Sequence, residues 1–71
     1  MNTMEYIRDK IDREQNRKKY PWFAYFQYGF HSIRFLTDEE CKEAVKFYNL
    51  KPIENGFARH GRQPITILRR E

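Results

Sequence analysis

A histidine flanked by arginines, in the order Arg-His-Gly-Arg at residues 59–62, is the segment best suited to catalysis. Imidazole transfers protons near neutral pH, and guanidinium groups hold phosphate oxygens. With Tyr48 or Tyr28 nearby, His60 could serve a metal-independent ribonuclease, the type of site that small basic toxins use. The same four residues also suit a solvent-exposed turn. A nuclease is therefore the third of three functional hypotheses, and we expect a protein that is not an enzyme.

Residues that could bind a cofactor or a metal ion are scattered along the sequence. The three glycines, Gly29, Gly56 and Gly61, are far apart and form no phosphate-binding loop. One cysteine and two histidines lack the spacing of a zinc site. The cysteine, Cys41, falls on the apolar stripe of a predicted helix, where a thiol packs as a small apolar group. We therefore expect no cofactor, no metal and no catalytic cysteine.

Aromatic residues concentrate in residues 20–30 (YPWFAYFQYGF), which hold seven of the twelve aromatic side chains and no charge. Along a strand, successive side chains point to opposite faces. One face would carry Trp22, Ala24, Phe26 and Tyr28, and the other Phe23, Tyr25 and Gln27. A one-sided sheet needs only one apolar face. The second aromatic face therefore predicts a covering helix, a partner chain or a ligand.

The chain is basic, with 14 Lys and Arg against 10 Asp and Glu, a net charge of +4. This excess permits nucleic-acid binding without requiring it. A single cysteine excludes an internal disulfide, which favours a reducing compartment. Charges from Glu5 onwards leave no room for a secretory signal, and the longest uncharged stretch is too short to span a bilayer. These features predict a cytoplasmic protein without membrane contact.

Capping residues predict two helices. Asn2 and Glu5 form a capping-box pair before a helix over 1–19, whose polar second half, DREQNRKK, could project from the core. Thr37 and Glu40 form a second capping box. The helix after it has one apolar face, made of Cys41, Ala44, Val45 and Tyr48.

Strands are expected at 22–28, 31–36 and 65–68, and Asn55-Gly56 gives a type I′ turn signal. Together with the helices they predict one small domain over residues 1–71, with the element order helix, strand, strand, helix, hairpin, strand. The expected fold class is α+β, in two layers. It has a mainly antiparallel sheet with two helices on one face.

Residues 28–35 (YGFHSIRF) resemble the RNP1 octamer of RNA recognition motifs, in the glycine, the first aromatic, the aliphatic sixth residue and the final aromatic. The spacing of residues 41–49 is similar to that family's second helix, and Gly61-Arg62 to the approach to its last strand. Ser32 stands where that family has a second aromatic, and no first strand precedes the N-terminal helix.

Alternation along residues 31–36 predicts which side chains of this strand reach the core. Ile33 and Phe35 would point inward, because they alternate with polar residues. The opposite side would carry Phe30, Ser32 and Arg34, and the RNP1 resemblance implies the same orientation. Joined to the second face of the aromatic strand, this predicts a platform of Phe23, Tyr25, Phe30 and Arg34.

The leading functional hypothesis is a non-enzymatic basic module that binds RNA or another single-stranded nucleic acid. Phe23, Tyr25 and Phe30 would stack on bases. Phosphate or partner contacts would come from Arg34, Arg59, His60, Arg62, Arg69 and Arg70. The alternative is a small inhibitor or adaptor, of mobile-element or phage type, that blocks a nucleic-acid-processing protein complex through the same aromatic face. A homodimer that covers this face is a further alternative.

Overall fold

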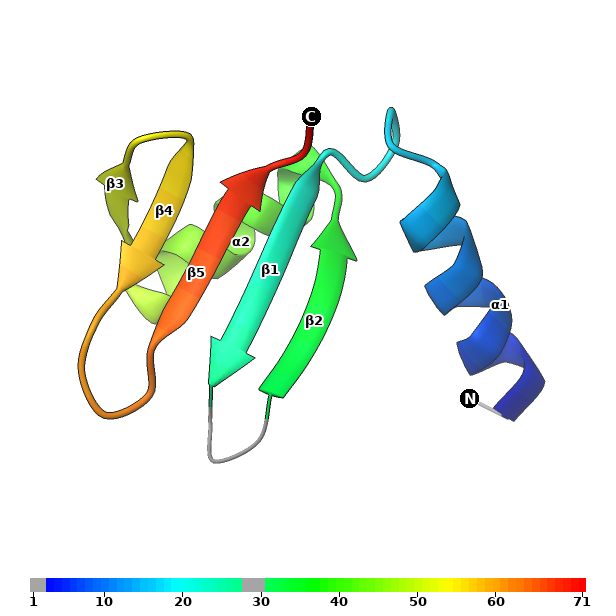
Figure 1. The fold of residues 1–71 in the computed structure, drawn as a ribbon, viewed down its shortest axis with the longest axis horizontal. Coiled ribbons are helices and arrows are strands. Elements are labelled where there is room, and N and C mark those ends of the chain that lie inside the picture. Colours follow the sequence, from blue (N-terminus) through cyan, green and yellow to red (C-terminus); the bar gives the residue numbers. More distant parts are fainter. Residues whose placement is uncertain (1–2, 28–30) are drawn as a thin grey trace.

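Two helices and five strands make up residues 3–27 and 31–71, the parts of the chain that the computed structural model describes (Figure 1). They are α1 (Thr3–Gln15), β1 (Trp22–Gln27), β2 (His31–Leu36), α2 (Asp38–Tyr48), β3 (Lys51–Ile53), β4 (Gly56–Arg59) and β5 (Ile65–Arg69). The predicted order of elements is confirmed. The predictions for Asn2, Tyr28, Gly29 and Phe30 lie outside the described residues.

The strands form one antiparallel sheet in the order β2-β1-β5-β4-β3. β1 and β5, which are rich in aromatic and β-branched residues, lie in its interior, and β2 and β3 form its edges. Figure 1 shows α2 behind this sheet and α1 beside it, next to β2. The expected α+β class is confirmed.

The second helix, α2, begins and ends where its sequence signals lie. Thr37 accepts a hydrogen bond from the Glu40 backbone N–H, and the Glu40 side chain accepts one from Thr37, which completes the capping box. Acidic residues fill the first turn, where the helix dipole favours them. Asn49 ends the helix in the left-handed conformation, with φ 55°.

The core lies between α2 and the face of the sheet that α2 covers. Its buried members are Ala24, Leu36, Cys41, Leu50, Ile65 and Ile67, and Trp22, Phe26, Ala44, Val45, Tyr48 and Phe57 pack against them. The inward faces predicted for β1 and α2 are therefore confirmed. Burial raises the pKa of the Cys41 thiol, which agrees with its predicted role as a core residue.

The predicted orientation of β2 is wrong. Phe35 lies opposite Phe23, and Ile33 opposite Tyr25. Directly opposed residues share a face, so Ile33 and Phe35 lie on the side away from α2. The physical reason is that β2 is an edge strand, of which α2 covers only one end. Of the side chains that β2 presents on the core side, Leu36 is buried and Arg34 stays exposed.

The helix α1 is shorter than predicted and is placed differently. It ends at Gln15, and it buries none of its side chains. The apolar residues Met4, Ile7 and Ile11 are 60%, 42% and 48% exposed. Instead, the polar C-terminal half contacts the rest of the fold, because Arg13 donates a hydrogen bond to the carbonyl of Phe35. The half that was expected to project is therefore the half that is anchored.

The β3–β4 hairpin turns one residue earlier than the Asn55-Gly56 signal predicts. Ile53 pairs with Gly56, so the turn consists of Glu54 and Asn55, and Asn55 has a positive φ of 66°. Gly56 already belongs to β4. A Cβ at this position would overlap the carbonyl oxygen of Ile67 in the neighbouring strand, which explains why a glycine is needed.

Candidate binding face

The face of the sheet away from α2 carries two rows of side chains that run across all five strands. Strand pairing gives one row as Ile53, Gly56, Leu68, Phe23 and Phe35, and the other as Lys51, Ala58, Thr66, Tyr25 and Ile33. We call these ten residues the open face. Among the residues that the structure describes, α1 borders this face along β2, and the buried cluster lies on the other side.

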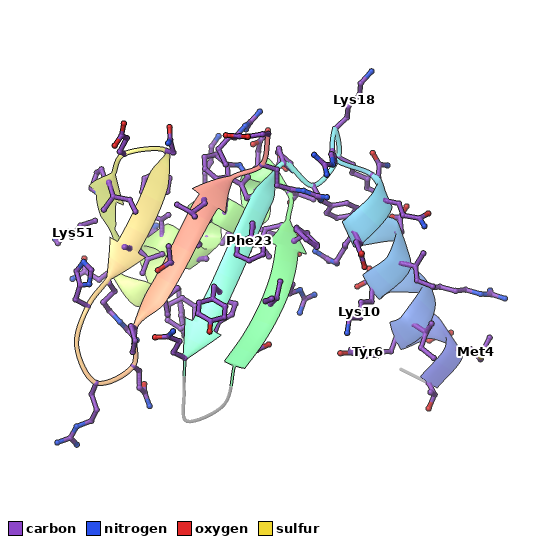
Figure 2. The ribbon with its side chains drawn as sticks, in the orientation of Figure 1. Met4, Tyr6, Lys10, Lys18, Phe23 and Lys51 are labelled. Carbon is purple, nitrogen blue, oxygen red and sulfur yellow. The ribbon has the colours of Figure 1, made fainter. Side chains whose placement is uncertain are left out.

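Large apolar side chains dominate the open face. Ile33 is 54% exposed and Ile53 is 41% exposed, and these two lie at opposite edges of the sheet. The ring of Phe23 on β1 and the ring of Phe35 on β2 lie 5.7 Å apart in a tilted pair. Figure 2 shows Phe23 on the side of the sheet turned toward the viewer. The prediction that Phe23 and Tyr25 lie opposite the helix-covered core is confirmed.

Arg70 closes one corner of the open face. Its guanidinium carbon lies 3.9 Å from the ring centre of Phe35. Its nitrogens donate to the carbonyls of Arg13 (2.9 Å), Tyr20 (3.1 Å) and Glu14 (2.6 Å), near the C-terminus of α1. A cation is favoured there by the helix dipole. Arg70 therefore anchors α1, and several of its donors are already used within the chain.

Three other predicted phosphate-binding arginines lie away from the open face. Arg34 is on the opposite face of β2, in line with Ala24, which corrects its predicted place on the platform. Arg69 also lies on the α2 side, 5.2 Å from the ring centre of Trp22, with Asp38 at 3.5 Å. Arg59 donates to the carbonyls of Tyr48 (3.3 Å) and Gln63 (2.9 Å).

His60 and Arg62 lie exposed in the loop between β4 and β5. Arg59 and Arg69 are at opposite ends of the antiparallel pair β4–β5, so the predicted basic residues form no single cluster. Tyr48, the proposed companion of His60, stacks on the guanidinium of Arg59 at 5.7 Å. In the described part of the chain, no group of three or more His, Cys, Asp or Glu side chains is placed to hold a metal ion.

A cleft of about 640 Å³ separates α1 from the β2 border of the open face. Figure 2 shows Tyr6 and Lys10 on the side of α1 that faces the sheet, and Met4 on the far side. Tyr6 and Lys10 line the cleft together with Phe23, Ile33, Arg34 and Phe35. Its volume falls within the ~300–1,000 Å³ range of ligand sites.

Sequence reasoning missed several residues of this face and cleft. Leu68 follows the apolar residues Ile65 and Ile67 in β5, so its place on the other face had no separate signal. Ile53 ends a strand of only three residues. Tyr6 was visible as an aromatic residue in a helix, but its position beside β2 follows from tertiary contacts.

Comparisons with protein-family models, with curated proteins and with solved structures found no significant match. No helix in the described residues is long and apolar enough to cross a membrane.

Proposed function

We propose that this protein is a non-enzymatic binding module that contacts another protein through the open face of its sheet. It corresponds to the small inhibitor or adaptor anticipated as the alternative hypothesis, and a complex that processes nucleic acid is the partner class that we favour. Because Cys41 is a free thiol, we propose that the protein acts in the reducing cytoplasm.

One observation carries this proposal. The open face joins Phe23, Tyr25, Phe35 and Leu68 to the exposed Ile33 and Ile53 in a contiguous apolar surface. Aromatic and aliphatic side chains dominate this surface, and its charged groups, Lys51 and the guanidinium of Arg70, lie at its borders. Such a composition is typical of the centre of a protein interface. A contiguous apolar surface on a chain this small calls for a partner.

Nucleic-acid binding through the same rings stays a prediction, but the charges support it less. A stacking platform needs cations along the path of the phosphates. Arg34 lies on the other face, and Arg59, Arg69 and Arg70 are engaged in contacts within the chain. The nuclease hypothesis likewise stays a prediction, since Arg59 is held by carbonyl groups beside His60.

The test is affinity capture from a nuclease-treated lysate of the source organism, with quantitative mass spectrometry. The wild type is compared with Ile33→Asp, which places a charge at the centre of the exposed β2 border. Phe47→Asp is the matched control, because Phe47 is 80% exposed on α2, on the other side of the sheet. In parallel, fluorescence anisotropy measures binding of single-stranded RNA and DNA at low salt.

We expect a protein that the wild type and Phe47→Asp retain and that Ile33→Asp loses. Equal capture by all three proteins would contradict the proposed face. Tight RNA or DNA binding that Ile33→Asp leaves intact would also contradict it. If Ile33→Asp instead abolishes tight nucleic-acid binding and no protein is captured, the face is correct but the leading sequence hypothesis replaces the protein partner.

A further inference from the structure

The outer edge of β2 offers unpaired backbone groups to the cleft beside α1. In an antiparallel sheet, the N–H and C=O of one residue point to the same side of the strand, and those of the next residue to the other side. β2 is the last strand of the sheet on its side, so every second residue directs its backbone outward. Two hydrogen bonds identify which residues these are.

The first hydrogen bond is made by β1. The N–H of Gln27 donates to the carbonyl of Pro64, 3.1 Å away, so Gln27 faces β5. The backbone N–H and C=O groups of the odd-numbered residues of β1 therefore point toward β5, and those of the even-numbered residues point toward β2. The even-numbered residues of β1 lie opposite Leu36, Arg34 and Ser32 of β2. The backbone groups of these three residues therefore point inward and form hydrogen bonds with β1. Ile33 and Phe35 must direct their backbone groups outward.

The second hydrogen bond supports the same assignment from the other side. Arg13 of α1 lies beyond the edge of β2, and its Nη1 donates to the carbonyl of Phe35 at 2.9 Å. The outward backbone group of Phe35 is thus already in use by a side chain. Two residues earlier, the N–H and C=O of Ile33 point to the same edge, and no described strand pairs with them.

The two edges of the sheet differ in how they are protected. The opposite edge strand, β3, has three residues, one of which is Pro52. A short edge strand with a proline resists pairing with another chain. β2 has six residues and no proline, and its side chain at the free edge, Ile33, is exposed and apolar. An edge of this kind is normally covered or used.

Charges in the cleft favour an acidic occupant. Arg13 is neutralised by Asp9 at 2.8 Å and by Glu40 at 2.8 Å. Lys10 and Arg34 are exposed on the two sides of the cleft and form no ion pair among the described residues. Against these two free cations, Glu14 is the remaining acid in the cleft wall. The residues that line the cleft carry three positive charges, from Lys10, Arg13 and Arg34, against two negative charges, from Asp9 and Glu14. Glu40 is not a lining residue and offsets this excess from behind the cleft wall, so the attraction for a carboxylate is local to Lys10 and Arg34.

We infer that the cleft takes an extended acidic peptide segment of another protein, which pairs with the edge of β2 and extends the sheet by one strand. This inference rests on the proposed function and specifies its partner. Alternate side chains of the peptide would continue the open face beside Ile33 and Phe35 and contact Tyr6. The side chains between them would lie beside Arg34, where a carboxylate is favoured. Main-chain hydrogen bonds would supply affinity, as in other cases of strand addition.

A second copy of the chain fits this cleft poorly. Its own β2 edge is bordered by its own α1, so edge-to-edge pairing would bring two α1 helices into the same space. A peptide without a flanking helix meets no such obstacle. We therefore commit to a segment of a different protein.

The experiment is a selection of phage-displayed random linear peptides of about 10 residues, the upper length of an ordinary strand, against the full chain. The affinity of selected synthetic peptides is then measured by fluorescence polarisation. Ile33→Pro removes the outward N–H and leaves the pairing with β1 intact, because proline is tolerated at an outward position of an edge strand. Ile33→Ala is the matched control, since it also loses the side chain but keeps the N–H.

We expect acidic peptides with alternating apolar residues, and an affinity for Ile33→Pro that is about tenfold or more below that for Ile33→Ala. Lys10→Glu should also weaken binding, whereas Lys46→Glu, on the exposed surface of α2, should not. The Ile33 amide of the wild type should exchange more slowly with solvent when peptide is bound. If Ile33→Pro fails to fold, protection of the wild-type Ile33 amide tests whether the peptide pairs with the edge of β2.

Failure to enrich any peptide, or equal affinities for Ile33→Pro and Ile33→Ala together with an unprotected Ile33 amide, would overturn the inference. A wild-type dimer in light scattering that Ile33→Pro dissociates would assign the edge to a second copy and would also overturn it. This experiment also distinguishes failure of the peptide inference from failure of the proposed function. If Ile33→Asp abolishes partner capture but Ile33→Pro matches Ile33→Ala, the open face binds the partner and strand addition does not.

Discussion

Arg13 and Glu40 join the two helices through two parallel hydrogen bonds, from Nη1 to Oε1 at 2.8 Å and from Nη2 to Oε2 at 3.0 Å. The same guanidinium donates from Nε to Asp9 and from Nη1 to the carbonyl of Phe35. One side chain thus connects α1, the edge of β2 and the first turn of α2. Its planar fork of donors suits this role better than a lysine would.

The first prediction concerns pH. The hydrogen bond from Arg13 is the main reason that the pKa of Glu40 falls from 4.5 to about 2. A lowered pKa in the folded state means that ionised Glu40 stabilises the fold above about pH 4.5, and that this contribution is lost as the pH falls toward 2. Urea denaturation at a series of pH values should show stability decreasing across this window.

Glu40→Gln isolates this effect, because glutamine can still complete the capping box with Thr37. The variant should be less stable than the wild type at neutral pH, and its stability should fall less on acidification. Glu39→Gln, one residue earlier and exposed, is the control and should follow the wild-type pH profile. Identical pH profiles for Glu40→Gln and the wild type would exclude the Arg13 contact as a source of stability.

The second prediction separates the two faces of the sheet with one type of substitution. Ile67 is fully buried between α2 and the sheet, so Ile67→Ala should lower the free energy of unfolding by about 2–5 kcal/mol. Ile33 is 54% exposed on the open face, so Ile33→Ala should change the free energy of unfolding by less than about 1 kcal/mol. Chemical denaturation measures both. A larger loss of stability for Ile33→Ala than for Ile67→Ala would contradict the exposed position of Ile33 and support the inward orientation that alternation in the sequence predicts.

The third prediction concerns the anchoring of α1 by Arg70. Arg70→Gln removes charged donors from the carbonyls of Arg13 and Glu14, so the amides of α1 should exchange with solvent faster while those of the sheet change little. Arg69→Gln is the neighbouring control and should leave α1 unchanged, because Arg69 contacts Asp38 and Trp22 on the other face. Equal exchange rates in α1 for the two variants would refute this role of Arg70.

The fourth prediction uses the sign of a stability change. In most strands, an alanine is more favourable than a glycine by roughly 0.5–1 kcal/mol. Gly56→Ala should instead destabilise the fold by about 1–3 kcal/mol, because the added Cβ overlaps the carbonyl oxygen of Ile67. A thermal unfolding curve at or above the wild-type melting temperature would contradict the close approach of β4 and β5.

Much of the fold could be predicted from local signals. The capping box of Thr37 and Glu40 gave the start of α2, and the inward face of β1 followed from alternation of large apolar residues. These signals are short-range and redundant. The same reasoning failed for Ile33 and Phe35, because alternation shows that two faces differ without showing which one a helix covers.

The position of α1 could not be predicted for a different reason. Its apolar stripe suggested the N-terminal half as the packed part, whereas the contacts come from Arg13 and Arg70, which are 57 residues apart. Polar contacts between distant residues leave no periodic pattern in a sequence. The cleft between α1 and β2, and with it the candidate peptide site, depends on these contacts.

The most direct test of the open face as the binding surface is site-specific photocross-linking. Ile33 or, as the control, Phe47 is replaced by p-benzoylphenylalanine, and each protein is irradiated in nuclease-treated lysate. Both positions are exposed, but they lie on opposite sides of the sheet. If the open face binds the partner, we expect a discrete protein adduct from position 33 and none from position 47. An adduct from position 47 alone, or the same adducts from both positions, would contradict it.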